Sequence, residues 1–220
     1  MKDVMWRALQ VWGVPVGMGI AYAMLIWSAD TDTTGKAWLS IGYAFVLVIW
    51  FVLSYLMTTA ALARAIDVAD VARLKDVSDR ALRSRRSDKA RAPYLVARAI
   101  AHELGGAHTE AIAALDEAKL DALPAGKRAG WQLRATSTRI AALVGLGQVS
   151  LARAALDAEL PPDAPRPAHS DAALLAALSA GRVLAAEGKR DDAAKKLRSV
   201  IDDVRATAAM RAGAQAALQK

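Results

Sequence analysis

Three related stretches in the second half of the chain decide its fold: 106–118 (GAHTEAIAALDEA), 147–160 (GQVSLARAALDAEL) and 188–200 (GKRDDAAKKLRSV). Successive glycines are 41 residues apart, and each is followed by an alanine five positions later and a leucine nine positions later. Glycine favours the end of one helix, and alanine beside leucine lets the next helix pack closely. The pattern predicts three helical hairpins, built on Gly106, Gly147, Gly188, Ala111, Ala152, Ala193, Leu115, Leu156 and Leu197.

Neighbouring positions extend this pattern. Thr109, Ser150 and Asp191 follow the three glycines at the same distance, and their side-chain oxygens suit them to be helix N-caps. A further helix, expected from about 203 to 218, would cap the end of the stack. Stacked hairpins bury a shared core that none of them could supply alone.

The repeated unit resembles the tetratricopeptide repeat family. In 106–118 the glycine, the alanine at 111, the leucine at 115 and the final alanine fall at the family's turn and second-helix positions, and Pro124 follows where the family tends to have proline. The resemblance covers residues 90–204 at most, with a period of 41 instead of 34 and without the family's first-helix Trp and Tyr signature. It implies an α-solenoid of about three hairpins.

The first quarter of the chain has a different composition. It contains ten of the twelve aromatic residues, and two runs, 8–28 and 37–59, carry no charge. About 20 apolar helical residues cross the hydrocarbon core of a bilayer, so the runs predict two transmembrane helices, joined as an antiparallel hairpin by 29–36. The first run also fits a cleavable signal peptide, because basic residues precede it and 21–23 (AYA) resembles a cleavage site. We favour the hairpin because the second run follows directly.

Basic residues predict the orientation of this hairpin. They are sparse in the link and dense after the second run, so both termini and the repeats are expected on the cytoplasmic side of a bacterial inner membrane. Aromatic anchors at the membrane interfaces are expected at Trp6, Trp27, Trp38 and Tyr55. The predicted organisation is all-α, with a two-helix transmembrane hairpin (1–59), a long helix extension with a basic segment (60–91) and the tetratricopeptide-like repeats (92–220).

Small residues recur at four-residue spacing in the first run, at Gly13, Gly17 and Ala21. Such a face lets another helix approach closely. Its partner is either the second run, through Ser40, Gly42 or Ala44, or a second subunit.

A basic cluster lies between the second run and the repeats, at Arg80, Arg83, Arg85, Arg86, Lys89 and Arg91, against the single acidic residue Asp88. It accounts for most of the formal net charge of +7. Contact with anionic lipids or an acidic partner is one interpretation, and a solvated loop is the other. Nucleic acid is disfavoured because no aromatic residue interleaves the cluster for base stacking.

Reactive groups are scarce in this sequence. It has no cysteine, and the two uncharged runs have no histidine to hold a haem iron. His102 and His108 lack a further ligand and are read as turn and surface residues, and adjacency of His169, Ser170 and Asp171 does not make a catalytic triad. We therefore predict no catalytic residue, metal, cofactor or small-molecule substrate. Trp131 is either a packing residue or a recognition anchor.

Three functions remain open at this stage. The favoured one is a non-catalytic accessory subunit of a multi-subunit inner-membrane complex, in contact with other membrane-protein subunits. Its layout is similar to that of small additional subunits in some bacterial photosynthetic reaction-centre and light-harvesting complexes, which implies that it holds pigment-binding proteins in place. The alternatives are a membrane-anchored tetratricopeptide-like adaptor or chaperone-like protein that binds peptides or client proteins, and an enzyme of unrecognised type.

Overall fold

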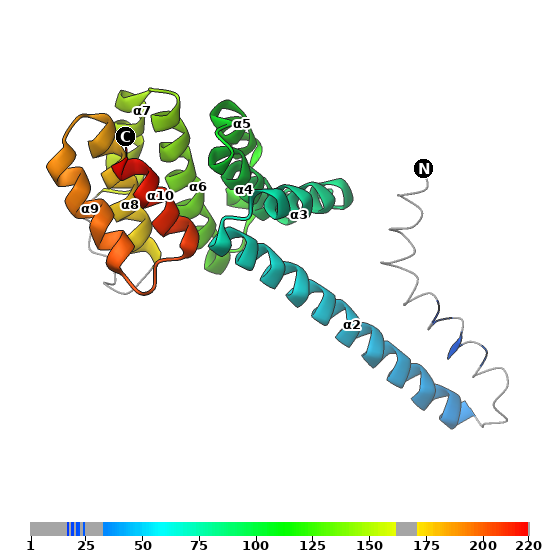
Figure 1. Cartoon of the computed structure of the whole chain (residues 1–220). Helices are drawn as coiled ribbons and strands as arrows, with labels where there is room; N and C mark the ends of the chain where they lie inside the picture. The colour runs from blue at the N-terminus through cyan, green and yellow to red at the C-terminus, as the bar shows by residue number, and fades with distance from the viewer. Residues whose placement is uncertain are drawn as a thin grey trace. The chain divides into compact units, whose positions relative to one another are not determined.

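The computed structural model describes residues 17, 19, 21, 22, 24, 33–161 and 171–219, and in this part of the chain it is all-α (Figure 1). It divides into two compact units, Met1–Ala60 and Ala61–Lys220. The second unit contains the repeated stretches.

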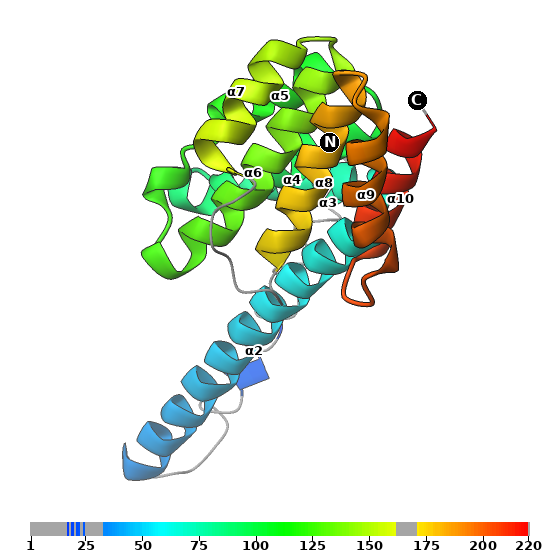
Figure 2. The same ribbon diagram turned by 90° about the vertical axis from the view of Figure 1, so that its left-hand side faces the viewer.

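Three helical hairpins form the body of the second unit, each with a longer first helix and a shorter second helix: α4 (Asp88–Leu104) with α5 (His108–Glu117), α6 (Ala125–Gly145) with α7 (Val149–Glu159), and α8 (Asp171–Ala186) with α9 (Arg190–Asp202). A 3-10 turn, η1 (Leu120–Ala122), precedes α6, and α10 (Ala208–Leu218) follows the last hairpin. The first helices contact one another in succession, α4 with α6 and α6 with α8, and α10 contacts both α8 and α9 (Figures 1 and 2).

The core of the second unit is shared between neighbouring hairpins. Ile140 on α6, Leu156 on α7 and Val183 on α8 are completely buried in one cluster. Leu197 on α9 belongs to the next cluster, with Met210 on α10. All the repeated alanines and leucines are buried, at no more than 5% exposure. The first of these clusters draws on two hairpins and the second on the last hairpin together with α10, so a single hairpin would leave part of its apolar surface in water.

The repeated glycines end the first helices. Gly106, Gly147 and Gly188 have φ values of 76°, 73° and 80°, in the left-handed region where only glycine is free of steric strain. Each turn has the same two backbone bonds; in the first, Gly106 N–H donates to Glu103 O at 3.0 Å and Ala107 N–H to His102 O at 2.8 Å. Such bonds satisfy carbonyl groups that the end of a helix leaves free.

The predicted N-caps need correction. Thr109, Ser150 and Asp191 are each the second residue of their helix. The N-cap positions fall directly after the glycines and have no side-chain cap hydrogen bond: Ala107, Gln148 and Lys189. Each helix therefore begins two residues earlier than the sequence suggests, because the left-handed glycine turns the chain so tightly.

A fourth turn of the same kind precedes the three predicted ones. Helix α2 (Thr33–Val68) ends at Ala69, whose φ of 59° is in the left-handed region, and α3 (Val71–Ser84) begins after Asp70. Ala69 N–H donates to Ile66 O at 3.2 Å and Asp70 N–H to Ala65 O at 3.1 Å, the same two bonds as in the glycine turns. The expected long helix through 60–91 is therefore broken at Ala69.

The end of α2 and helix α3 thus make an additional hairpin. Five and nine residues after the turn residue, the other hairpins have alanine and leucine. This hairpin has Leu74 and Ser78 at those positions, and both are fully buried. The large residue is therefore at the first position and the small residue at the second, the reverse of the order in the other hairpins. The Ser78 hydroxyl donates to Leu74 O at 2.7 Å, so its burial leaves no unpaired donor.

The predicted membrane anchor is wrong. Among the described residues, no helix combines the length and apolar character needed to cross a bilayer. Most of the first uncharged run, 8–28, lies outside those residues, and the second, 37–59, is part of α2, which continues into Arg64 and Asp67. An uncharged run rich in apolar residues did not identify a spanning helix here. The inner-membrane localisation and the cytoplasmic orientation drawn from it are withdrawn with it.

Candidate functional site

The described part of α2 before Ala60 exposes large apolar side chains. They belong to Trp38, Ile41, Phe45, Val46, Val48, Ile49, Val52, Leu53 and Met57, with exposed fractions from 40% to 72%. They follow one another without a regular polar face, so the helix is not the ordinary amphipathic kind that covers one core. Exposed apolar surface of this extent marks a place where another molecule binds.

Earlier residues contact α2 at one place within the first unit. The rings of Tyr22 and Tyr43 stack with centroids 4.5 Å apart, and Tyr22 Oη donates to Ser40 Oγ at 2.5 Å. A Cβ atom on Gly19 would lie 3.0 Å from Tyr43 Oη, whereas nothing lies within 4 Å of the equivalent point on Gly17. The close approach is therefore made at Gly19, which the sequence analysis did not single out.

The predicted small-residue face and aromatic anchors are only partly described. Ala21 and Trp38 are exposed. The residues Gly13, Trp6 and Trp27, and the side chain of Tyr55, lie outside the described residues. The role of the aromatic residues as membrane anchors is withdrawn together with the two-span hairpin.

Inside the second unit, the first helices enclose a small cavity of about 80 Å³. Glu103 on α4 and Arg182 on α8 form an ion pair across it at 3.4 Å, with side chains only 14% and 15% exposed. The N-terminal part of α10 also lines this cavity, through Thr207 and Met210. Because small-molecule sites usually measure about 300–1,000 Å³, this space is too small for a peptide or a metabolite.

A wider depression of about 950 Å³ lies at the other ends of the hairpins. It is lined by the C-terminal ends of α5 and α7 and the N-terminal half of α6, including Leu115, Leu133 and Leu160. Three of its polar side chains are paired: Arg139 with Asp116 at 2.5 Å, and the Glu159 carboxylate with the Thr136 hydroxyl. The depression has volume, but its chemistry does not identify a ligand.

Ion pairs join consecutive hairpins. The Arg153 guanidinium on α7 donates two hydrogen bonds to the Glu187 carboxylate at the end of α8, at 2.7 and 2.6 Å. The bonds from Arg153 hold the pKa of Glu187 down, from 4.5 to about 2, and Lys189 adds to the effect. In the hairpin before, Arg91 on α4 is paired with Glu117 on α5 at 2.5 Å. The Arg153–Glu187 pair therefore joins two consecutive hairpins, and the Arg91–Glu117 pair joins the two helices of one hairpin.

The six basic residues of the predicted contact cluster have different environments. Arg80 is paired with Asp76, and Arg91 with Glu117. The Arg85 guanidinium lies 4.2 Å from the centre of the Tyr94 ring, a cation–π contact. Arg83, Arg86 and Lys89 are exposed. These last three are exposed and have no ion-pair partner among the described residues.

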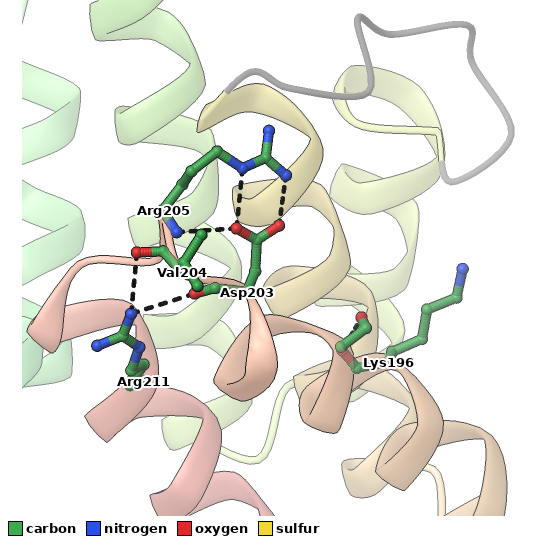
Figure 3. Close-up of polar contacts among 6 residues, drawn as sticks. Lys196, Asp203, Val204, Arg205 and Arg211 are labelled. Carbon is green, nitrogen blue, oxygen red and sulfur yellow. Dashed lines mark hydrogen bonds and ion pairs between the residues drawn. The ribbon is translucent and has the colours of Figure 1, made fainter.

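The connection between α9 and α10 is held by arginines (Figure 3). The guanidinium of Arg205 forms a fork on the Asp203 carboxylate, with one bond of 2.9 Å. Arg211 donates to the carbonyl oxygens of Asp203 and Val204 at 3.2 and 3.1 Å. Val204 projects from this fixed loop with 89% exposure, but a single exposed valine is common on protein surfaces.

The two histidines at the first glycine turn are structural. Burial lowers the pKa of His102, and the nearby Arg98 and Lys75 lower it further. The His108 ring packs against Gly145, where an added Cβ would lie 2.3 Å from Nε2. No group of His, Asp and Glu within the described ranges is placed to hold a metal ion.

Trp131 contributes to packing. It is half-buried against two core clusters, one formed by α2, α3 and α4 and the other by α4, α5 and α6, and the Arg134 guanidinium lies 6.0 Å from the centre of its ring. His169 and Ser170 lie outside the described residues, and Asp171 is paired with Arg134 at 3.6 Å.

No known family model matches the sequence, and the comparisons with curated proteins and with solved structures also find no match. The resemblance to tetratricopeptide repeats therefore stays a prediction.

Proposed function

We propose that this protein is a non-catalytic subunit of a larger protein assembly, in which the exposed apolar surface of α2 is buried against neighbouring polypeptides. The observation that carries this proposal is the run of exposed apolar side chains between Trp38 and Met57. Burying one large apolar side chain stabilises a protein by about 1.5–3 kcal/mol. Covering five of them would contribute about 10 kcal/mol, which is comparable with the stability of a whole domain.

The second unit supports the proposal through its rigidity. Its first helices line a cavity of about 80 Å³ crossed by a largely buried ion pair, and a further ion pair joins two of its hairpins. An adaptor that exchanges peptide ligands needs an open groove; the cavity of about 80 Å³ is too small to be one, and the chemistry of the depression of about 950 Å³ does not identify a ligand. A rigid stack of hairpins instead suits a part that holds neighbours at fixed positions.

A matched pair of substitutions tests this function. Leu53 on α2 and Leu151 on α7 have similar exposed fractions, 51% and 55%. Leu53→Glu and Leu151→Glu therefore introduce the same charge at equally accessible leucines. The tagged full-length chain and both variants would be expressed in the native host, purified under mild conditions and analysed by quantitative mass spectrometry and native mass measurement.

We expect the wild-type chain to be recovered with defined polypeptides at fixed stoichiometry. Leu53→Glu should lose at least about nine tenths of them, since a buried charge without a partner costs several kcal/mol. Leu151→Glu should retain them. Recovery of the wild-type chain alone, or equal behaviour of the two variants, would contradict the proposed function.

A further inference from the structure

The junction between α3 and α4 has more positive charge than its own acidic residues can neutralise. Three side chains there are exposed and take part in no ion pair within the described residues: Arg83, Arg86 and Lys89, which we call the basic corner. Elsewhere in the second unit most arginines that face a neighbouring helix have a carboxylate partner.

The acidic residues near the basic corner are already occupied. Asp76 is paired with Arg80, and Asp79 lies 3.7 Å from Arg98. Asp88, the carboxylate nearest in sequence, accepts a hydrogen bond from Lys119 Nζ at 3.1 Å. The three charges of the corner are therefore left without internal compensation.

Two of the three charges also occupy an unfavourable place. Arg86 directly precedes the N-cap of α4, and Lys89 is the second residue of that helix. The N-terminus of a helix has partial positive charge, so cations there are destabilising and anions are favoured. Residues that break a local rule without compensation inside the fold are expected at functional places.

The backbone of the corner is fixed in advance. Arg85 stacks on Tyr94, and its N–H donates to Ala81 O at 3.0 Å. On the other side, Ser87 O accepts bonds from Ala90 N–H and Arg91 N–H, both at 3.0 Å. A partner that binds the corner therefore does not have to order a loop, which would reduce its affinity.

We propose that the basic corner binds an acidic segment of a neighbouring polypeptide. The guanidinium groups of Arg83 and Arg86 can each donate two parallel hydrogen bonds to a carboxylate. Recognition of an anionic lipid surface typically uses four to eight basic residues, and the corner has three. Nucleic acid lacks a stacking surface here, because Tyr94 is 2% exposed and covered by Arg85. This assignment rests on the proposed function, since it names a second contact made by the same assembly subunit.

The test compares two triple substitutions in the full chain that remove the same charge. R83Q/R86Q/K89Q neutralises the corner, and R190Q/K195Q/R198Q neutralises three exposed cations on α9 that have no ion pair among the described residues. The probe is fluorescein-labelled octaglutamate, with binding measured by anisotropy at low and at physiological salt. Vesicles of phosphatidylserine and phosphatidylcholine form a separate arm, and thermal unfolding checks that each variant folds.

The corner variant should bind octaglutamate about tenfold more weakly than the wild type, because three exposed ion pairs at about 0.5 kcal/mol each sum to about 1.5 kcal/mol, and about 1.4 kcal/mol is tenfold. The α9 variant should change the affinity less than twofold. The corner variant should also unfold at about the same temperature as the wild type, because Arg86 and Lys89 oppose the dipole of α4 whereas Arg83 is in the last turn of α3, where a cation is favourable.

Equal affinities of the two variants would overturn the inference, and so would corner-dependent binding to vesicles without binding to octaglutamate. The proposed function is tested separately: Leu53→Glu should lose the assembly and still bind octaglutamate like the wild type, and a Leu53→Glu variant that keeps the assembly would contradict the proposed function without changing the octaglutamate result. If R83Q/R86Q/K89Q assembles normally and binds octaglutamate as tightly as the wild type, the binding role of the basic corner is refuted and the proposed function is not.

Discussion

Replacing Ala69 by glycine should stabilise the protein, although it removes a methyl group. Ala69 has φ 59° at the turn between α2 and α3. An L-residue in the left-handed region costs about 1–2 kcal/mol, and glycine avoids this cost. Against this, glycine loses more backbone entropy on folding, by about 0.5–1 kcal/mol relative to alanine. The net effect is a stabilisation of about 0.5–1 kcal/mol.

The assay is guanidinium unfolding of Ala69→Gly, followed by circular dichroism, beside the reciprocal variant Gly106→Ala. Nothing lies within 4 Å of the position where a Cβ on Gly106 would sit, so that substitution tests backbone strain without a steric clash. It should destabilise the protein by about 1 kcal/mol or more. Thermal midpoints should move in the same directions, by about 2–4 °C per kcal/mol for a chain of this size.

The two variants together test whether Ala69 forms a turn of the same type as the glycines. Destabilisation by Ala69→Gly, in a chain that Gly106→Ala also destabilises, would refute the reasoning. It would mean that Ala69 lies inside a continuous helix, where glycine is unfavourable. The sign of a single measurement therefore separates a fourth hairpin from the uninterrupted helix that the sequence suggested.

Three further predictions concern stability. Leu156→Ala should destabilise the protein by about 2–5 kcal/mol in denaturant unfolding, because Leu156 is completely buried, whereas Leu151→Ala should change the stability by less than about 0.5 kcal/mol. The pKa of Glu187 is lower in the folded than in the unfolded state, so stability from its bonds with Arg153 is present above about pH 4.5 and is lost as the pH falls toward about 2. That loss should reach at most about 3 kcal/mol, and Glu187→Gln should lack this part of the acid dependence. Burial and neighbouring cations lower the pKa of His102 in the folded state, so the unfolded state binds a proton at higher pH than the folded state. The stability of the wild type should therefore decline as the pH falls below about 6.5, and this decline should be absent in His102→Gln.

The three glycine turns could be predicted because they depend on local chemistry. A left-handed residue at the end of a helix favours glycine wherever it occurs, and the 41-residue repeat of Gly106, Gly147 and Gly188 made these places visible. The fourth turn does not follow this pattern, because its left-handed residue, Ala69, is not a glycine and lies 37 residues before Gly106 instead of 41. The two turn bonds and the N-cap Asp70, which accepts from Arg73 N–H at 2.9 Å, hold it in this conformation.

The basic cluster shows where a sequence argument reaches its limit. Six basic residues within twelve positions look equivalent in the sequence. In the structure, Arg80 and Arg91 are neutralised by carboxylates, and Arg85 is stacked on an aromatic ring. Glu117, the partner of Arg91, is 26 residues away along the chain, so only the packing of α5 against α4 brings them together. The available charge is half of what the sequence indicates.

The sequence by itself determined the all-α class, the positions of the glycine turns and the residues buried beside them, because these follow from backbone sterics and from side-chain size within one hairpin. The tertiary structure decided which charges remain free, how small the space between the first helices is, and that α2 breaks at Ala69. Those properties depend on which residues meet across helices, and a pattern along one chain contains no record of such distances.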